Sequence, residues 1–168
     1  MIRAALITVS TKGAAGERTD ESGPAMRAAL TAAGIGVIEE ALVPDGIAPV
    51  QAAIRSAIDR GANLVLTSGG TGLSPNDLTP DATRGLLDRE IAGIAEALRW
   101  NSLERTPHGM LSRGLAGSIG ATLVVNLPGS PRACRESLDV LIPVLPHAIE
   151  LLAGATGEAG HATGRHSS

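Results

Sequence analysis

The chain has 168 residues, of which 43% are hydrophobic and 18% charged, and its formal net charge is −3. One domain is the natural expectation at this length, and the apolar fraction is sufficient for a packed core. Trp100 is the only aromatic residue, Cys134 is the only cysteine, and no dense basic run occurs. These features argue against a nucleic-acid partner, an intrachain disulfide and a cysteine-based zinc site.

The first half of the chain alternates between strand-like and helix-like segments. In chain order we expect strand, helix, strand, helix and strand over residues 2–9, 24–33, 35–44, 48–60 and 63–68. The strands are short apolar runs, and the second helix carries its apolar residues at helical spacing. Pro24 lies in a first helical turn, and Gly34 and Gly61 follow the helices as stop signals. The apolar run at 2–9 is too short for a signal peptide or membrane span, so we expect a cytoplasmic protein with no membrane partner.

The second half begins with a Gly- and Pro-rich segment, TSGGTGLSPNDLTPDAT, over residues 67–83. Thr79 is expected to cap a short helix there, with Pro80 as its first residue. In chain order we then expect a helix over 88–100, an irregular polar piece over 104–114, and strands over 115–119 and 122–126. Gly120 would join these two strands in an antiparallel hairpin.

A last helix should begin at Ser130-Pro131, as N-cap and first residue, and be interrupted near Pro143 and Pro146. Residues 153–168 contain no large apolar side chain, so we expect a domain over 1–152 followed by a disordered tail. The alternation of strands and helices predicts a three-layer α/β fold. Its mostly parallel sheet should carry helices on both faces and one antiparallel hairpin element.

Polar residues follow four of the expected strands. These positions are Ser10-Thr11, Asp45, the segment 67–83 and the run 126–130. In open α/β sheets, ligands bind beyond the carboxyl ends of the strands, so these residues should share one edge. That convergence predicts a ligand site.

The glycines of the segment suggest what kind of ligand this would be. Gly69, Gly70 and Gly72 allow backbone conformations in which successive amides bind an anion. The helix start at Ser130-Pro131 offers a second anion site. The alternative is that these are ordinary turns and an ordinary cap, since Gly-rich turns after strands are common.

Asp77 and Asp45 are the acidic residues at this expected edge that are candidates for a catalytic role. A carboxylate in an anion cradle would repel phosphate unless a divalent cation joined them, so Mg²⁺ binding is the role expected for Asp77. The alternative for both residues is a turn former. Arg113 lies in the irregular piece and could bind phosphate or lie free on the surface. The phosphate-loop pattern GxxxxGK[ST], metal-ligand spacing of histidines and a Ser-His-Asp order are all missing.

The block TSGGTGLSPNDLTPDAT, together with NLPGSP at 126–131, resembles the MogA/MoaB family of molybdenum-cofactor biosynthesis proteins. This family includes bacterial molybdopterin adenylyltransferases and the corresponding domains of eukaryotic cofactor-assembly proteins. The resemblance covers about residues 3–152 and includes Ser10, the Val-Pro-Asp at 43–45 and the Leu-Ser-Arg at 111–113. GGTG alone would be a weak signal, but the long block with the second motif in its place is a strong one.

The resemblance implies nucleotidyl transfer. The terminal phosphate of molybdopterin would attack the α-phosphorus of ATP, releasing pyrophosphate and giving adenylylated molybdopterin. Asp77 and Asp45 would be the catalytic residues and would bind Mg²⁺. The resemblance also implies ligand contacts from Ser10, Ser68, Gly69, Gly70, Thr71, Gly72, Arg113, Pro128, Gly129 and Ser130.

The family further suggests a homotrimer and a hand-over of the product to a molybdate-insertion protein. Two other interpretations stay open. The chain could be a molybdopterin-binding protein of the same pathway that does not turn over ATP, or an unrelated α/β nucleotide binder. Retention of both Asp45 and Asp77 favours the enzyme.

Overall fold

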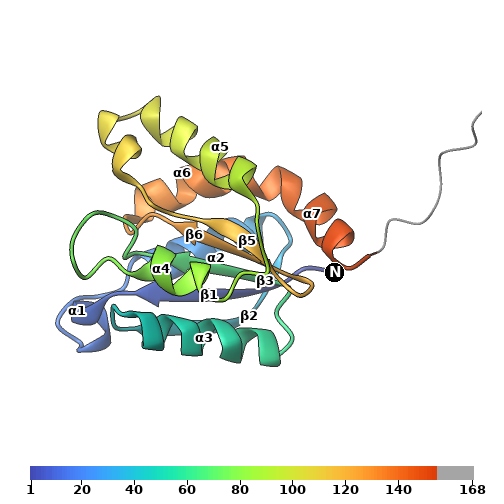
Figure 1. Cartoon of the computed structure of the whole chain (residues 1–168), viewed down its shortest axis with the longest axis horizontal. Helices are drawn as coiled ribbons and strands as arrows, with labels where there is room; N and C mark the ends of the chain where they lie inside the picture. Colours follow the sequence, from blue (N-terminus) through green and yellow to red (C-terminus); the bar gives the residue numbers. More distant parts are fainter. Residues whose placement is uncertain (155–168) are drawn as a thin grey trace, which may run out of the picture.

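The computed structural model describes residues 1–154, which form one six-stranded sheet between two layers of helices (Figure 1). The strands are β1 Arg3–Val9, β2 Gly36–Val43, β3 Leu64–Ser68, β4 Arg89–Glu90, β5 Ala116–Ile119 and β6 Thr122–Leu127. The helices are α1 Thr11–Ala14, α2 Ser22–Ala32, α3 Ile47–Asp59, α4 Thr79–Arg84, α5 Ala92–Leu103, α6 Pro131–Leu141 and α7 Leu145–Leu152, with 3-10 turns η1 Pro107–Leu111 and η2 Ile142–Val144. None of these helices is long and apolar enough to cross a membrane.

The strand order is β2-β1-β3-β6-β5-β4. Strands β2, β1, β3 and β6 are parallel, whereas β5 pairs antiparallel with both β6 and β4. The predicted three-layer fold and its hairpin are therefore confirmed. Because four neighbouring strands run in the same direction, the loops after β1, β2, β3 and β6 all lie at one edge of the sheet.

Alternating side chains along each central strand fill two separate cores. On one face, Leu6 and Leu66 are buried against the layer of α2, α5, α6 and α7. On the other face, Ile7 and Val65 are buried against α3 and α4. Both faces of β1 and β3 are thus apolar, as expected for parallel strands covered by helices on both sides.

The structure corrects three expected element boundaries. The segment after Asp88 first forms the short edge strand β4, so the helix begins only at Ala92. Strand β4 pairs with β5 at Gly117, where a Cβ would lie 2.5 Å from the carbonyl oxygen of Arg89. The polar link after β1 contains the one-turn helix α1, and Thr79 is the first residue of α4 rather than its N-cap.

The expectations for the last helix are confirmed. Ser130 caps α6 by accepting a hydrogen bond from the amide of Ala133, and Pro131 is the first helical residue. The helix is interrupted before Pro143 by the turn η2, after which α7 continues to Leu152. The predicted tail lies outside the described residues beyond Gly154.

Candidate functional site

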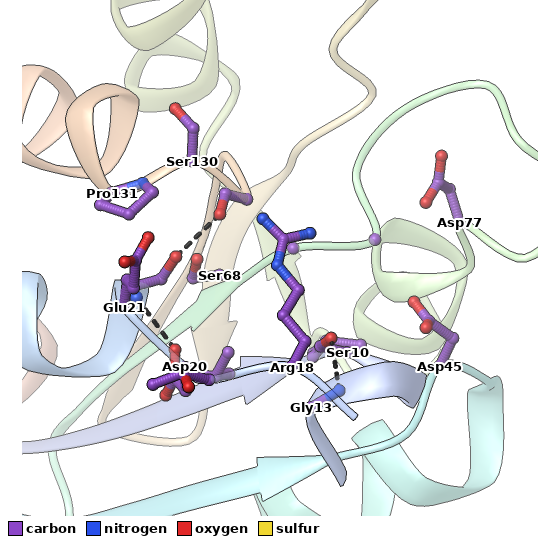
Figure 2. A pocket seen from close by; sticks show the side chains of 17 residues that line it. Ser10, Gly13, Arg18, Asp20, Glu21, Asp45, Ser68, Asp77, Ser130 and Pro131 are labelled. Carbon is purple, nitrogen blue, oxygen red and sulfur yellow. Dashed lines mark hydrogen bonds between the residues drawn. The ribbon is translucent and has the colours of Figure 1, made fainter. Parts of the chain in front are cut away.

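A polar pocket of about 420 Å³ lies at the carboxyl edge of the parallel strands (Figure 2). Eight residues singled out from the sequence line it: Ser10, Asp45, Ser68, Gly69, Gly70, Asp77, Gly129 and Ser130. They come from four loops that are far apart in the chain. The expected convergence on one edge is therefore present.

Asp45 closes the pocket beside the end of β2 and fixes the turn that follows β1. Its Oδ2 accepts hydrogen bonds from the amide of Thr11 at 2.9 Å and from the Thr11 hydroxyl at 2.6 Å. Ser10 caps the same turn, because its Oγ accepts the amide of Gly13 at 3.0 Å. The second carboxylate oxygen of Asp45, Oδ1, takes no hydrogen bond from residues 1–154. Asp45 thus stabilises α1 with one oxygen and presents the other to the pocket.

Gly69 and Gly70 bring the chain after β3 very close to its neighbours. Gly69 has φ +100°, and a Cβ there would lie 2.4 Å from the carbonyl oxygen of Val9. Gly70 has φ +63°, and its Cβ would lie 2.4 Å from Thr79 Oγ1 and 3.3 Å from Asp45 Oδ1. Both positions require glycine for conformation and for space. As a result, bare backbone rather than side chains faces the pocket next to the Asp45 carboxylate.

Asp77 lies in the loop between β3 and α4 and shapes that loop itself. Its Oδ2 accepts the amide of Ser74 at 3.0 Å, while its own amide donates to the Ser74 carbonyl at 2.9 Å. A Cβ on Gly72 would lie 2.9 Å from this Oδ2, so a larger residue there would displace the Asp77 carboxylate. Asp77 and Asp45 lie on the same side of the pocket in Figure 2.

The opposite side of the pocket is formed by the start of α6 and by buried hydroxyl groups. Ser68 is fully buried, and its Oγ donates to the carbonyl of Pro128 at 2.8 Å. The hydroxyl of Ser22 donates to the carbonyl of Gly129 at 2.7 Å. These two bonds hold the turn before Ser130, so the start of α6 lies beside the pocket. Pro131 has no amide hydrogen and the amide of Ala133 donates to Ser130 Oγ, so the amide of Arg132 is the one that this first turn offers to an anion.

The loop before α2 and the first residue of that helix contribute pocket residues that sequence reasoning missed: Arg18, Thr19, Asp20, Glu21 and Ser22. Asp20 accepts the hydroxyl of Thr8 at 2.8 Å and the amides of Ser22 and Gly23 at 2.9 and 3.1 Å. It therefore starts α2 two residues earlier than Pro24 had suggested. Asp20 stands two positions before the first residue of α2, and an Asp just before a helix is a capping signal that could have been read from the sequence.

The charges lining the pocket are mostly negative. Asp20, Glu21, Asp45 and Asp77 line it together with one basic residue, Arg18. In Figure 2 the guanidinium of Arg18 extends between the side of Ser68 and the side of Asp77. Anions can enter such a pocket only if the carboxylates are neutralised, because like charges at short range repel in a partly desolvated site.

Four other predicted ligand residues do not line the pocket: Thr71, Gly72, Pro128 and Arg113. Pro128 contributes its carbonyl to Ser68 and to Cys134, whose Sγ lies 2.9 Å away. Arg113 bonds to the loop that carries Asp77 rather than facing the pocket. Within residues 1–154, no group of three or more His, Cys, Asp or Glu side chains could hold a metal.

Residues 5–147 match the family described as a probable molybdopterin binding domain. The chain belongs to this family. Its similarity to other members extends over most of its length. A molybdopterin adenylyltransferase of Haemophilus influenzae is 36% identical over 142 residues, covering 83% of this chain and 72% of the relative. The crystal structure of the molybdopterin biosynthesis enzyme MoaB from Thermus thermophilus has 50% identity and a TM-score of 0.86, covering 92% of this chain and 98% of that one.

Longer proteins are also similar to this chain. A molybdenum cofactor biosynthesis bifunctional protein of Chlorobaculum tepidum is 40% identical over 153 residues, which cover 90% of this chain. The chain spans 49% of that relative's length. The resemblance to the MogA/MoaB family is thereby confirmed.

Proposed function

We propose that this chain is a Mg²⁺-dependent molybdopterin adenylyltransferase that acts in molybdenum cofactor biosynthesis. A phosphate oxygen of molybdopterin forms a bond to the α-phosphorus of ATP, and the bond from that phosphorus to the leaving oxygen breaks. The products are adenylylated molybdopterin and pyrophosphate. Relatives named molybdopterin adenylyltransferase support this reaction.

The observation that carries the proposal is the pairing of two kinds of group in one pocket. Backbone amides and a helix start, suited to phosphate, lie together with the carboxylates of Asp45 and Asp77. Nucleotidyl transfer requires little covalent chemistry from the protein. It requires two anionic substrates held in line with their charge neutralised.

The donor atoms present fit Mg²⁺, which binds oxygen ligands and commonly takes one or two protein carboxylates plus substrate phosphates. Asp45 and Asp77 would hold the ion, each through the oxygen that the loop leaves without a hydrogen bond. When bound, the ion would neutralise the acidic lining and the phosphate charge. The amide of Gly70 and the start of α6 would orient the phosphates, whereas the amide of Gly69 donates to the carbonyl of Leu127 at 3.3 Å. Arg18 would add a positive charge.

The remaining expectations form part of the same proposal. Ser10, Ser68, Gly129 and Ser130 would shape the substrate contacts, directly or by holding the turns that make them. We also propose a cytoplasmic homotrimer that passes its product to a molybdate-insertion protein.

The decisive experiment supplies the purified chain with molybdopterin, ATP and Mg²⁺ and measures adenylylated product and pyrophosphate. We expect turnover that stops on chelation and returns with added Mg²⁺. Asp77→Ala should lower kcat at least about 100-fold, as for the loss of a preorganised electrostatic group, while molybdopterin binding and folding persist. Asp59→Ala is the matched control, because Asp59 is exposed in α3 and does not line the pocket. Tight molybdopterin binding without any product would instead identify a non-catalytic binding protein of the pathway.

A further inference from the structure

Arg113 lies between η1 and β5 and bonds to one segment of the chain, residues 71–81. Its amide donates to the carbonyl of Thr71 at 2.8 Å, and its Nε donates to the carbonyl of Gly72 at 2.9 Å. Its Nη2 donates to the carbonyl of Asp77 and to Asp81 Oδ2, the latter at 2.9 Å. All three guanidinium nitrogens are engaged, since Nη1 also lies 3.4 Å from Asp81 Oδ1.

The loop that these bonds reach has few other restraints. The amides of Ser74 and Asp77 bond only within the loop, and the amide of Thr79 bonds to the carbonyl of Gly70. Among the described residues, Arg113 is the only one outside 70–82 that hydrogen-bonds to residues 71–78. The loop therefore depends on Arg113 for its position relative to the sheet.

The positive charge of Arg113 is already paired with the carboxylate of Asp81. The ion pair with Asp81 is partly exposed, and the hydrogen bond from Arg113 holds the pKa of the Asp81 carboxyl below its ordinary value. A guanidinium bonded to two carbonyls and one carboxylate has its planar fork of donors in use. Arg113 also does not line the pocket.

We propose that Arg113 is a positioning residue that holds Asp77 at the pocket through the backbone of residues 72–77, and that it does not contact a substrate phosphate. This inference rests on the proposed function for its kinetic consequence. Its structural consequence, a loop restrained by one side chain, can be measured without substrates. The two consequences are therefore tested separately.

The first test is amide hydrogen exchange of the full chain. In Arg113→Ala and Arg113→Lys, the amides of Ser74, Asp77 and Thr79 should exchange at least tenfold faster than in the unsubstituted protein. Arg84→Gln is the matched control, because Arg84 makes a similar exposed ion pair, with Glu90 at 3.0 Å, and its side chain makes no hydrogen bond or ion pair with residues 71–78. Equal exchange of these three amides in the Arg113 variants and the control would overturn the proposal.

The second test compares kcat and KM per folded enzyme. A displaced Asp77 should lower kcat at least tenfold while both KM values stay within about twofold, because the lost interaction acts on the reacting groups. The kcat of Arg113→Lys should be nearly as low as that of Arg113→Ala, because a single ammonium group cannot donate to both carbonyls that the guanidinium reaches. A raised KM for ATP or molybdopterin that Lys largely restores would instead show a phosphate contact and refute the proposal. If the unsubstituted chain makes no product, the proposed function fails, and the exchange experiment alone decides on Arg113.

Discussion

Alanine at Gly69 should destabilise the fold far more than alanine at a typical turn glycine. Gly69 follows β3 directly and has φ +100°, a conformation that residues with a side chain rarely adopt. The added Cβ would lie 2.4 Å from the carbonyl oxygen of Val9 and 3.8 Å from its Cβ. Neither neighbour can move alone, because Val9 is the last residue of β1 and is buried in the core against α3.

The expected cost has two parts. A side chain forced into a sparsely populated backbone region costs about 1–3 kcal/mol, and overpacking against rigid neighbours costs a further 1–3 kcal/mol or so. Together they predict a loss of about 2–6 kcal/mol in the free energy of unfolding. Gly120→Ala isolates the first part, because Gly120 has φ +55° but no atom within 4 Å of its Cβ position. That control should lose only about 1–2 kcal/mol.

Urea unfolding followed by far-UV circular dichroism measures both losses. With a slope of about 2 kcal/mol per molar urea, Gly69→Ala should lower the midpoint by about 1–3 M and Gly120→Ala by less than about 1 M. If the two variants agreed within about 0.5 kcal/mol, the contact with Val9 would carry no energy, and the explanation for glycine at this position would be wrong.

Three further outcomes are expected from buried and paired groups. Burial raises the pKa of the Cys134 thiol, so thiol reagents at pH 8 should modify this residue only as fast as the chain unfolds. Rapid modification of the folded protein would contradict this expectation. Asn126→Ala should lower the free energy of unfolding, measured with urea, by about 2–4 kcal/mol, because the buried side-chain amide of Asn126 bonds to Thr67, Thr83 and the Leu115 amide. A loss below about 1 kcal/mol would show that these hydrogen bonds do not stabilise the fold. Asp81→Asn removes a carboxyl whose folded pKa is lowered, so its contribution is present above the unfolded pKa and is lost as pH falls through the folded one. The variant should therefore be less stable at pH 7, by no more than about 1 kcal/mol for an exposed pair. Its deficit should shrink as pH falls through the folded pKa of Asp81, and a deficit that does not change with pH would exclude this ion pair as its cause.

The features that the sequence predicted well are those governed by short-range physics. Ser130 and Pro131 start a helix because a cap needs only the next three residues, and the structure has this cap. Gly120 joins β5 and β6 because a two-strand hairpin is closed by its own turn. The alternation of apolar runs with helical stripes was sufficient to predict the three layers, because each element must bury its own apolar face.

The sequence also located much of the pocket lining, for a simple geometric reason. In a parallel sheet the chain leaves every strand at the same edge, so Ser10, Asp45 and Asp77 could be placed together without knowing any contact. Asn126 was less well placed, since it was counted both as the last residue of a strand and among the ligand-site residues after it, but lies buried inside β6. A side chain's direction depends on which neighbours surround it, and periodicity does not contain that information.

Only the tertiary structure decided what these residues touch. Arg113 could be read as a phosphate ligand until the fold placed it against carbonyls 41 and 36 positions earlier in the chain. Strand β4 formed because β5 offered an unpaired edge, which overrode the helical pattern beginning at Asp88. Arg18 lines the pocket only because of how the polar loop that carries it folds. The types of chemical group at the site were thus determined locally, whereas their roles depended on long-range contacts that no local pattern specifies.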